Sequence, residues 1–155
     1  MEHTYKAYYQ SPIGLMEIRA TRQAITSISF CDSCGPEEAC PIVRECIKQL
    51  DEYFSGKRKD FRLNLAPEGT EFRRKVWQAL QTIPFGETRS YREIAAAIGN
   101  ARACRAVGAA NRENPIPIII PCHRVIGRNG GLIGYSSGLW RKEWLLRHEA
   151  GNPAG

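Results

Sequence analysis

The chain is organised around Asn114-Pro115-Ile116-Pro117-Ile118-Ile119-Ile120-Pro121-Cys122-His123-Arg124-Val125, which places a cysteine, a histidine and an arginine directly after an apolar run. The prolines at 115, 117 and 121 disfavour both a helix and a ladder-paired central strand. The run 116–120 therefore predicts a short extended segment that is buried in a core. Cys122 would then lie where a buried and rigid segment ends.

The two residues after Cys122 indicate a reactive thiol. A positively charged histidine or arginine beside a cysteine favours the thiolate, which lowers the pKa of the thiol and raises its reactivity at neutral pH. The alternative is an inert core cysteine with basic neighbours, because buried unreactive cysteines are common. Cys122 and its two neighbours alone do not distinguish a reactive thiol from an inert one.

Length and composition are those of a soluble globular protein. The chain has 155 residues, of which 43% are hydrophobic and 25% charged, enough for one or two small domains with a core. No stretch approaches the roughly 18 consecutive apolar residues of a transmembrane helix, and the start lacks the features of a signal peptide. We therefore expect a cytoplasmic protein whose six cysteines are thiols, ligands or nucleophiles rather than disulfides.

The positive charge of the chain is concentrated in its second half. Residues 1–69 hold nine Lys/Arg and ten Asp/Glu, whereas residues 70–155 hold thirteen Lys/Arg and six Asp/Glu. A basic segment of this kind favours a polyanionic partner, nucleic acid first. A basic surface without such a partner is the alternative.

The first half predicts a small sheet covered by a helix. Alternating apolar and polar residues indicate three antiparallel strands, at 4–9, 15–20 and 24–30. A polar loop with three cysteines leads to a helix over about 41–54, which ends at Ser55-Gly56. The charged connection at 57–69 suggests a domain boundary, with domains at 1–69 and 70–155.

The second half predicts mainly helices, two of which form a helix-turn-helix. Thr70 is a plausible N-cap for a helix that ends before Pro84, and Ser90 with Glu93 forms a capping box for the next helix. A glycine-containing break separates that helix from a third at 101–112, which carries Arg105. Tight packing of these two helices is the alternative to a role in DNA binding, and the two are compatible.

The last expected helix, at 139–149, carries a carboxylate on its apolar face. Glu149 shares this face with Leu145 and Lys142, and an unpaired buried carboxylate would be costly. His123 is a candidate partner. A nucleophile, a base and an orienting carboxylate form the logic of a hydrolase triad, and here they share a domain with a basic helix-turn-helix. This combination points to a protein that attacks a group attached to DNA.

Several motifs together resemble the O6-alkylguanine-DNA alkyltransferase family, the methylated-DNA–protein cysteine methyltransferases. The strongest is Pro121-Cys122-His123-Arg124-Val125. Others, in the same order and spacing, are Phe85-Gly86-Glu87-Thr88, Ser90-Tyr91, Arg105-Ala106-Val107-Gly108, Asn114-Pro115, Gly134-Tyr135-Ser136 and Lys142-Glu143-Trp144-Leu145-Leu146 with Glu149. The resemblance is strong over about 70–150 and looser over 4–69. It implies an α+β fold, with a ribonuclease-H-like antiparallel sheet and helix followed by a mostly helical domain containing the helix-turn-helix.

The resemblance implies a reaction and a role for each site residue. Cys122 would take the alkyl group from O6 of guanine by displacement at carbon, leaving S-alkylcysteine and intact guanine, with O4-alkylthymine open as a second substrate. The transfer would be irreversible, so each molecule acts once, and it needs no cofactor. His123 would deprotonate the thiol through a water, Glu149 would hold the imidazole, and Asn114 would brace the helix-turn-helix against the cysteine segment.

The resemblance also implies how double-stranded DNA containing O6-alkylguanine is held. The base would be flipped out through the minor groove, which costs stacking and pairing energy, and Arg105 would fill the gap. Tyr91 would bond the guanine and stabilise the charge left on it. The other residues expected to contact DNA or the base are Ser136, Tyr135, Val125, Ala103, Ala106 and Arg112. The protein would act as a monomer and would not bind a membrane.

Some residues depart from the family pattern. Four thiols could form a zinc site, namely Cys31, Cys34, Cys40 and Cys46. The zinc ligand set of some family members includes His and is not found here, so we expect reduced thiols and no metal. Cys104, in the expected DNA-binding helix, is interpreted as a small packing residue. The three tryptophans are also interpreted as packing residues rather than as a base-stacking platform, namely Trp77, Trp140 and Trp144.

Three other functions are alternatives to alkyl transfer, and the sequence argues against each. A DNA-binding relative that does not repair would lack the acceptor thiol, and Cys122 argues against it. A regulatory fusion that senses alkylation would need a further domain, for which 155 residues leave no room. A thiol hydrolase would not need the basic helix-turn-helix.

Overall fold

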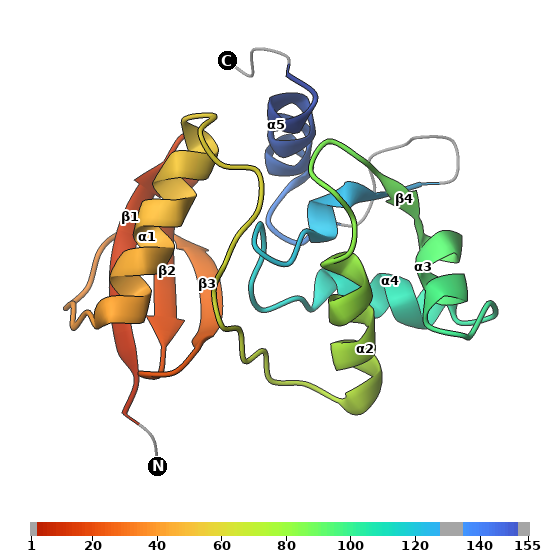
Figure 1. The fold of residues 1–155 in the computed structure, drawn as a ribbon, viewed down its shortest axis with the longest axis horizontal. Helices are drawn as coiled ribbons and strands as arrows, with labels where there is room; N and C mark the ends of the chain where they lie inside the picture. The colour runs from red at the N-terminus through yellow and green to blue at the C-terminus, as the bar shows by residue number, and fades with distance from the viewer. Residues whose placement is uncertain (1–2, 128–134, 152–155) are drawn as a thin grey trace. The chain divides into compact units, whose positions relative to one another are not determined.

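The computed structural model describes residues 3–127 and 135–151, in two compact units, Met1–Glu68 and Gly69–Gly155 (Figure 1). Gly134, the first residue of the Gly134-Tyr135-Ser136 motif, lies outside the described residues. Among the described residues, no helix has both the length and the apolar character needed to cross a membrane.

The first unit is a three-stranded antiparallel sheet with one helix against it (Figure 1). The strands are β1 (Tyr5–Ser11), β2 (Gly14–Ala20) and β3 (Ile25–Cys31), in the order β1-β2-β3. Helix α1 (Pro41–Phe54) starts with proline at a position where no backbone donor is needed, and it packs on β1 and β2. The expected sheet and helix are confirmed, because alternation in the strands and a helical stripe place their apolar side chains in one core.

The second unit is mostly helical. Its elements are α2 (Glu71–Leu80), β4 (Arg89–Ser90), α3 (Tyr91–Ala97), α4 (Cys104–Arg112), the 3₁₀ helix η1 (Cys122–Arg124), β5 (Val125–Ile126) and α5 (Leu139–Glu149). Strands β4 and β5 form a short parallel pair that the sequence did not predict. This pair joins the start of α3 to the segment that follows Cys122.

Helices α3 and α4 pack on each other as the expected helix-turn-helix (Figure 1). The capping box of α3 is present: the Ser90 hydroxyl accepts from the Glu93 N–H, and the Glu93 carboxylate accepts from the Ser90 N–H. Helix α4 starts at Cys104 and not at 101 as expected. Gly99, at φ +79°, ends the preceding helix. The residues between Gly99 and Ala103 form the turn, so the next helix starts after Ala103, its N-cap residue.

The apolar run before Cys122 is buried but not extended, so that prediction is wrong. The Ile120 N–H donates to the carbonyl of Ile116 at 2.9 Å, and Ile118 lies at φ +75°. A β-branched residue rarely adopts a positive φ. Asn114 closes this tight turn, because its Nδ2 donates to the Ile120 carbonyl at 2.8 Å and its Oδ1 accepts from the Ile116 N–H at 2.9 Å. The prolines remove donors that a strand would need, and the turn supplies its own hydrogen bonds.

The three tryptophans differ in their environments. Trp77 is buried, and its indole N–H donates to the Ala110 carbonyl at 2.8 Å, which ties α2 to α4 and confirms its packing role. Trp144 is half-buried and stacks on His148 with ring centroids 5.0 Å apart. Trp140 is 55% exposed, which does not fit its interpretation as a packing residue. It lies in the first turn of α5, where Arg141 stacks on its ring at 4.6 Å.

Candidate functional site

Cys122 lies at the start of η1 and is nearly inaccessible to solvent, with 4% of its surface exposed. Its N–H donates to the Ile120 carbonyl at 2.8 Å, and its carbonyl accepts from the Val125 N–H. Two asparagines converge on it. The Asn111 Nδ2 donates to the Cys122 carbonyl at 3.3 Å, and Asn114, whose amide closes the preceding turn, opposes the rise in the pKa of the thiol. The cysteine is therefore fixed through its backbone.

Burial sets the acidity of this thiol. It raises the pKa of Cys122 to about 11, and the hydrogen bond from Asn114 and the charge of Lys142 oppose this rise without cancelling it. The prediction that His123 and Arg124 lower this pKa is therefore wrong. Adjacency in the sequence does not bring their charges to the sulfur, because both side chains bind a carboxylate instead. The thiol is protonated at neutral pH and needs a base.

His123 can act as that base because its imidazole is neutral and one ring nitrogen, Nδ1, keeps its lone pair. It is fully buried, and burial lowers its pKa although Glu149 opposes the shift. Its Nε2–H donates to the Glu149 carboxylate at 2.7 Å, which leaves the lone pair on Nδ1. Nδ1 is buried and has no hydrogen-bond partner among the residues that the structure describes. The expected contact between His123 and Glu149 is present.

Glu149 holds more than the imidazole. Its carboxylate also accepts from the Arg124 Nε at 2.7 Å, from the Arg124 Nη2 at 3.0 Å and from the Gly86 N–H at 3.3 Å. Burial would raise the pKa of Glu149, but the charges and hydrogen bonds of His123 and Arg124 outweigh burial and hold it well below its usual range. The Arg124 Nη1 donates to the Ile83 carbonyl at 2.7 Å, so this ion pair ties η1 and α5 to the end of α2.

Lys142 is a buried cation of the site whose role the sequence did not reveal. It is fully buried, and its Nζ donates to the Val125 carbonyl at 2.6 Å. Burial lowers its pKa to about 8, and the charge of Cys122 opposes the shift. The available signal was a lysine on the apolar face of the terminal helix. It is placed where it favours a thiolate at Cys122.

Two tyrosines lie within electrostatic reach of Cys122. Tyr91, the first residue of α3, is half-buried, and burial raises its pKa while Arg112 and a hydrogen bond with Asn111 oppose the rise. Tyr135 is buried, its hydroxyl has no partner among the described residues, and burial holds its pKa well above the usual value. Ser136, the next residue, is exposed.

Four of the residues expected to contact DNA lie on α4 or at its start. Arg105, Ala106 and Arg112 are exposed, and Ala103 is half-buried. The structure thus leaves two arginines of this helix in solvent.

The N-terminal cysteines do not come together. Cys31 donates to the Leu15 carbonyl at 3.7 Å and Cys40 to the Thr21 carbonyl at 3.9 Å, whereas Cys34 is exposed. Burial raises the pKa of Cys46 to about 12. Over residues 3–127 and 135–151, the structure brings together no three His, Cys, Asp or Glu side chains that could hold a metal ion. Cys104 is half-buried.

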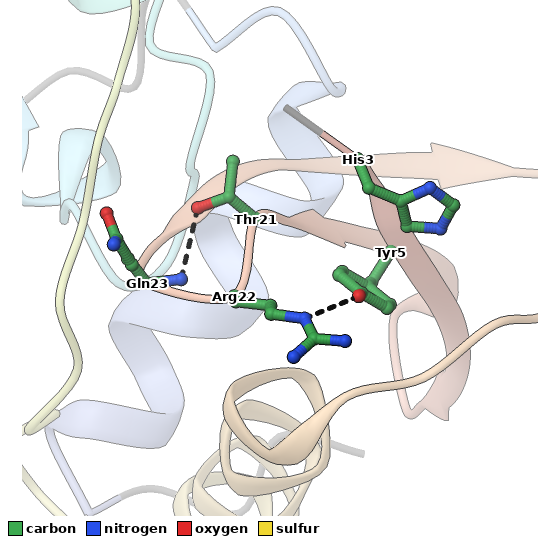
Figure 2. A pocket seen from close by; sticks show the side chains of 5 residues that line it. All are labelled: His3, Tyr5, Thr21, Arg22 and Gln23. Carbon is green, nitrogen blue, oxygen red and sulfur yellow. Dashed lines mark hydrogen bonds between the residues drawn. The ribbon is translucent and has the colours of Figure 1, made fainter. Parts of the chain in front are cut away.

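A pocket in the first unit contains none of the residues around Cys122 (Figure 2). It is lined by His3, Tyr5, Thr21, Arg22 and Gln23. The Arg22 Nε donates to the Tyr5 hydroxyl at 2.7 Å and the guanidinium lies over the ring at 5.7 Å. None of these five is a residue expected to act in alkyl transfer.

Comparison with known families gives two matches that together cover almost the whole chain. The family model described as "6-O-methylguanine DNA methyltransferase, DNA binding domain" matches residues 71–151. The model described as "6-O-methylguanine DNA methyltransferase, ribonuclease-like domain" matches residues 4–67.

Individual relatives are similar over their full length. A methylated-DNA--protein-cysteine methyltransferase of Methanosarcina barkeri is 62% identical over 155 residues, covering 96% of this chain and 98% of the relative. One of Methanosarcina acetivorans is 49% identical over 154 residues, covering 94% and 97%. The crystal structure of Mycobacterium tuberculosis OGT in complex with DNA has a TM-score of 0.88 at 42% identity, covering 95% of this chain and 94% of that chain.

Proposed function

Because this chain belongs to the 6-O-methylguanine DNA methyltransferase family, we propose that it repairs DNA by moving the alkyl group of O6-alkylguanine to its own Cys122. The observation that carries this proposal is the buried pair of His123 and Glu149 directly after Cys122: a protonated thiol follows the turn at 116–120, and the neutral imidazole of the next residue is held by a carboxylate at 2.7 Å. This is the activity of a methylated-DNA–protein-cysteine methyltransferase.

The transfer balances with groups that the chain supplies. The Cys122 thiol loses its proton to Nδ1 of His123, through a water, and the resulting imidazolium is stabilised by the Glu149 carboxylate. The sulfur then attacks the alkyl carbon while the carbon–O6 bond breaks, and that electron pair moves into the guanine ring. Tyr91 donates a hydrogen bond to the base as this charge develops. The purine leaves as an anion and takes up one proton, which balances the proton that His123 received from the thiol. The products are S-alkylcysteine and guanine, and no cofactor takes part.

The product explains why each molecule acts once. A thioether carbon–sulfur bond has no good leaving group, so the side chains around Cys122 offer no route back to the thiol. Lys142 supports the forward step, because its buried charge favours the thiolate that forms before attack. Its hydrogen bond also fixes the Val125 carbonyl, one of the backbone groups that would read the guanine edge.

The DNA would bind across the helix-turn-helix. We propose that α4 enters the minor groove, that Ala103 and Ala106 allow close approach, and that Arg105 fills the gap left by the flipped base. The exposure of Arg105 and Arg112 supports this proposal. Tyr135 and Ser136 would line the base pocket, and the unpaired, buried hydroxyl of Tyr135 supports that assignment.

Four finer points belong to the same proposal. The working domains are residues 1–69 and an alkyl-accepting domain at 70–155, and the two family matches support a boundary there because they end at 67 and begin again at 71. We also propose that the protein acts as a monomer and that it is cytoplasmic, and O4-alkylthymine stays open as a second substrate.

The test is to incubate the protein with duplex DNA bearing one O6-methylguanine and to measure its intact mass. The expected result is one added methyl group, mapped to Cys122 and absent in Cys122→Ala. Repeated turnover would favour a hydrolase instead. Tight binding of the DNA without a change in mass would identify a non-repairing relative.

A further inference from the structure

Three buried side-chain atoms have no hydrogen-bond partner among the residues that the structure describes, and they belong to residues around Cys122. They are Nδ1 of His123, the hydroxyl of Tyr135 and Oδ1 of Asn111. His123 follows Cys122 in the chain, Tyr135 lies within electrostatic reach of the thiol, and the Asn111 amide contacts the Cys122 carbonyl. Buried polar groups without a partner are rare in folded proteins, so their concentration here indicates a site that a polar molecule fills.

Asn111 is the member of this group that has no role in the transfer proposed above. It lies in α4 and is 2% exposed. Its Nδ2 donates to the Cys122 carbonyl at 3.3 Å. A carbonyl oxygen can only accept, so the amide nitrogen must face it, and this settles the orientation of the amide. The unpaired atom of Asn111 is therefore an acceptor, held next to the main chain of the residue that takes the alkyl group.

The fold gains little from this acceptor. The Cys122 carbonyl also accepts from the Val125 N–H, so it would have a partner without Asn111. An unpaired buried oxygen is unfavourable, because its hydrogen bond to water is lost and not replaced. An apolar side chain of similar size would avoid that cost at this position. A substrate that brings a donor to Oδ1 would explain why an asparagine is there.

The proposed substrate offers one kind of donor. Alkylation at O6 removes the hydrogen from N1 of guanine, the ring nitrogens N3 and N7 only accept, and N9 is bonded to the sugar. The 2-amino group therefore carries the remaining N–H bonds of the base. O4-alkylthymine carries no N–H bond, because alkylation removes the hydrogen from N3 and N1 is bonded to the sugar. A buried acceptor beside the alkylated base can thus distinguish the two substrates.

We propose that Oδ1 of Asn111 accepts a hydrogen bond from the 2-amino group of the extruded O6-alkylguanine, which makes Asn111 a specificity-determining residue for guanine over O4-alkylthymine. The inference rests on the proposed function, in which the base is held against Cys122. Nδ2 keeps its hydrogen bond to the Cys122 carbonyl, so the amide links the base to the backbone of the reacting residue. A base without the 2-amino group leaves Oδ1 buried and unpaired, and it is disfavoured for that reason.

The probe is O6-methylhypoxanthine, which is O6-methylguanine without the 2-amino group. Single-turnover rates of methyl transfer are measured for both bases, at one position of the same duplex, with the wild type and with Asn111→Leu. The ratio of the O6-methylguanine rate to the O6-methylhypoxanthine rate should be about tenfold larger in the wild type, the effect of one hydrogen bond. Differences between the two duplexes are common to both proteins and cancel in this comparison.

The ratio separates recognition of the base from a structural role. If Asn111 only supports the fold, or only holds a buried water, Asn111→Leu slows transfer from both bases by the same factor, and the inference is overturned. Arg105→Ala is the matched control on the same helix: it removes a proposed contact with the DNA and none with the 2-amino group, so it should slow transfer from both bases alike. If the leucine variant does not fold, Asn111→Ala is measured against the same criterion.

The wild type distinguishes this inference from the proposed function. If it gains no methyl group on Cys122 from O6-methylguanine DNA, the proposed function fails. If it gains one, and the ratio of the two rates is the same in the wild type and in Asn111→Leu, only the inference fails.

Discussion

Replacing Glu149 by glutamine should damage both the fold and the chemistry, and the two losses can be separated. The carboxylate is almost wholly buried and binds the Arg124 guanidinium through two nitrogens, at 2.7 and 3.0 Å. A glutamine is neutral, so Arg124 would remain as a buried cation without a counter-charge. Removing one partner of a buried ion pair typically costs about 3–5 kcal/mol. Total stability is only about 5–15 kcal/mol, so a large part of it is at stake.

The matched control is His123→Gln. It removes the base, but it leaves Arg124 paired with Glu149 and can still donate to the carboxylate. Its cost should be about 1 kcal/mol, the scale of one altered hydrogen bond. The transfer rate should nevertheless fall by about 10²–10⁴, as expected for loss of a general base. Glu149→Gln should lower the rate as well, because the imidazolium loses its stabilising charge.

The assays are thermal unfolding and single-turnover methyl transfer, with both variants measured beside the wild type. A loss of about 3 kcal/mol corresponds to a fall in the melting temperature of at least about 6 °C for a chain of this size. His123→Gln should lie within a few degrees of the wild type. Equal melting temperatures for the two variants would refute the argument that the pair of Glu149 with Arg124 stabilises the fold.

Three further outcomes follow from the charges of the site. The free energy of unfolding should fall as the pH drops from 7 to 4. The folded state lowers the pKa of His123 below 6.5 and that of Glu149 below 4.5, so the unfolded chain binds more protons than the folded one in this range. Urea titrations at several pH values measure this, and a flat profile would contradict it. Alkylation of Cys122 by iodoacetamide, followed by peptide mass mapping, should rise with pH up to about pH 11, whereas in urea it should level off near the ordinary thiol value of 9. Lys142→Met should slow methyl transfer and shift its rate profile to higher pH, since the thiolate loses a favourable charge; a profile identical to that of the wild type would argue against this role.

Local signals were sufficient for much of the fold. Apolar periodicity placed α1 and α5, and the capping box at Ser90 marked the start of α3, because these features depend on residues within a few positions of each other. The pairing of β4 with β5 joins segments far apart in the sequence, each of two residues, and no local pattern reveals it. The turn at Ile118 likewise depends on burial that makes an unfavourable φ tolerable.

The candidate site shows the same division. The order of residue types in the chain suggested Cys122, His123 and Glu149, and the last two are in contact. A sequence does not show side-chain directions: it predicts Arg124 as a neighbour of the thiol, whereas the Arg124 side chain binds Glu149. Asn111 was missed because a polar residue on a helix gives no sign of which carbonyl lies opposite.

The high pKa of Cys122 fits a protein that is consumed by its reaction. A thiol with a lowered pKa would be a thiolate at neutral pH and would react with any small electrophile that reached it. Each such event would destroy one molecule, because the acceptor is not regenerated. Burial keeps the thiol protonated until a substrate binds, and His123 and Lys142 then favour its ionisation. The same burial that slows unwanted alkylation therefore makes the base and the lysine necessary.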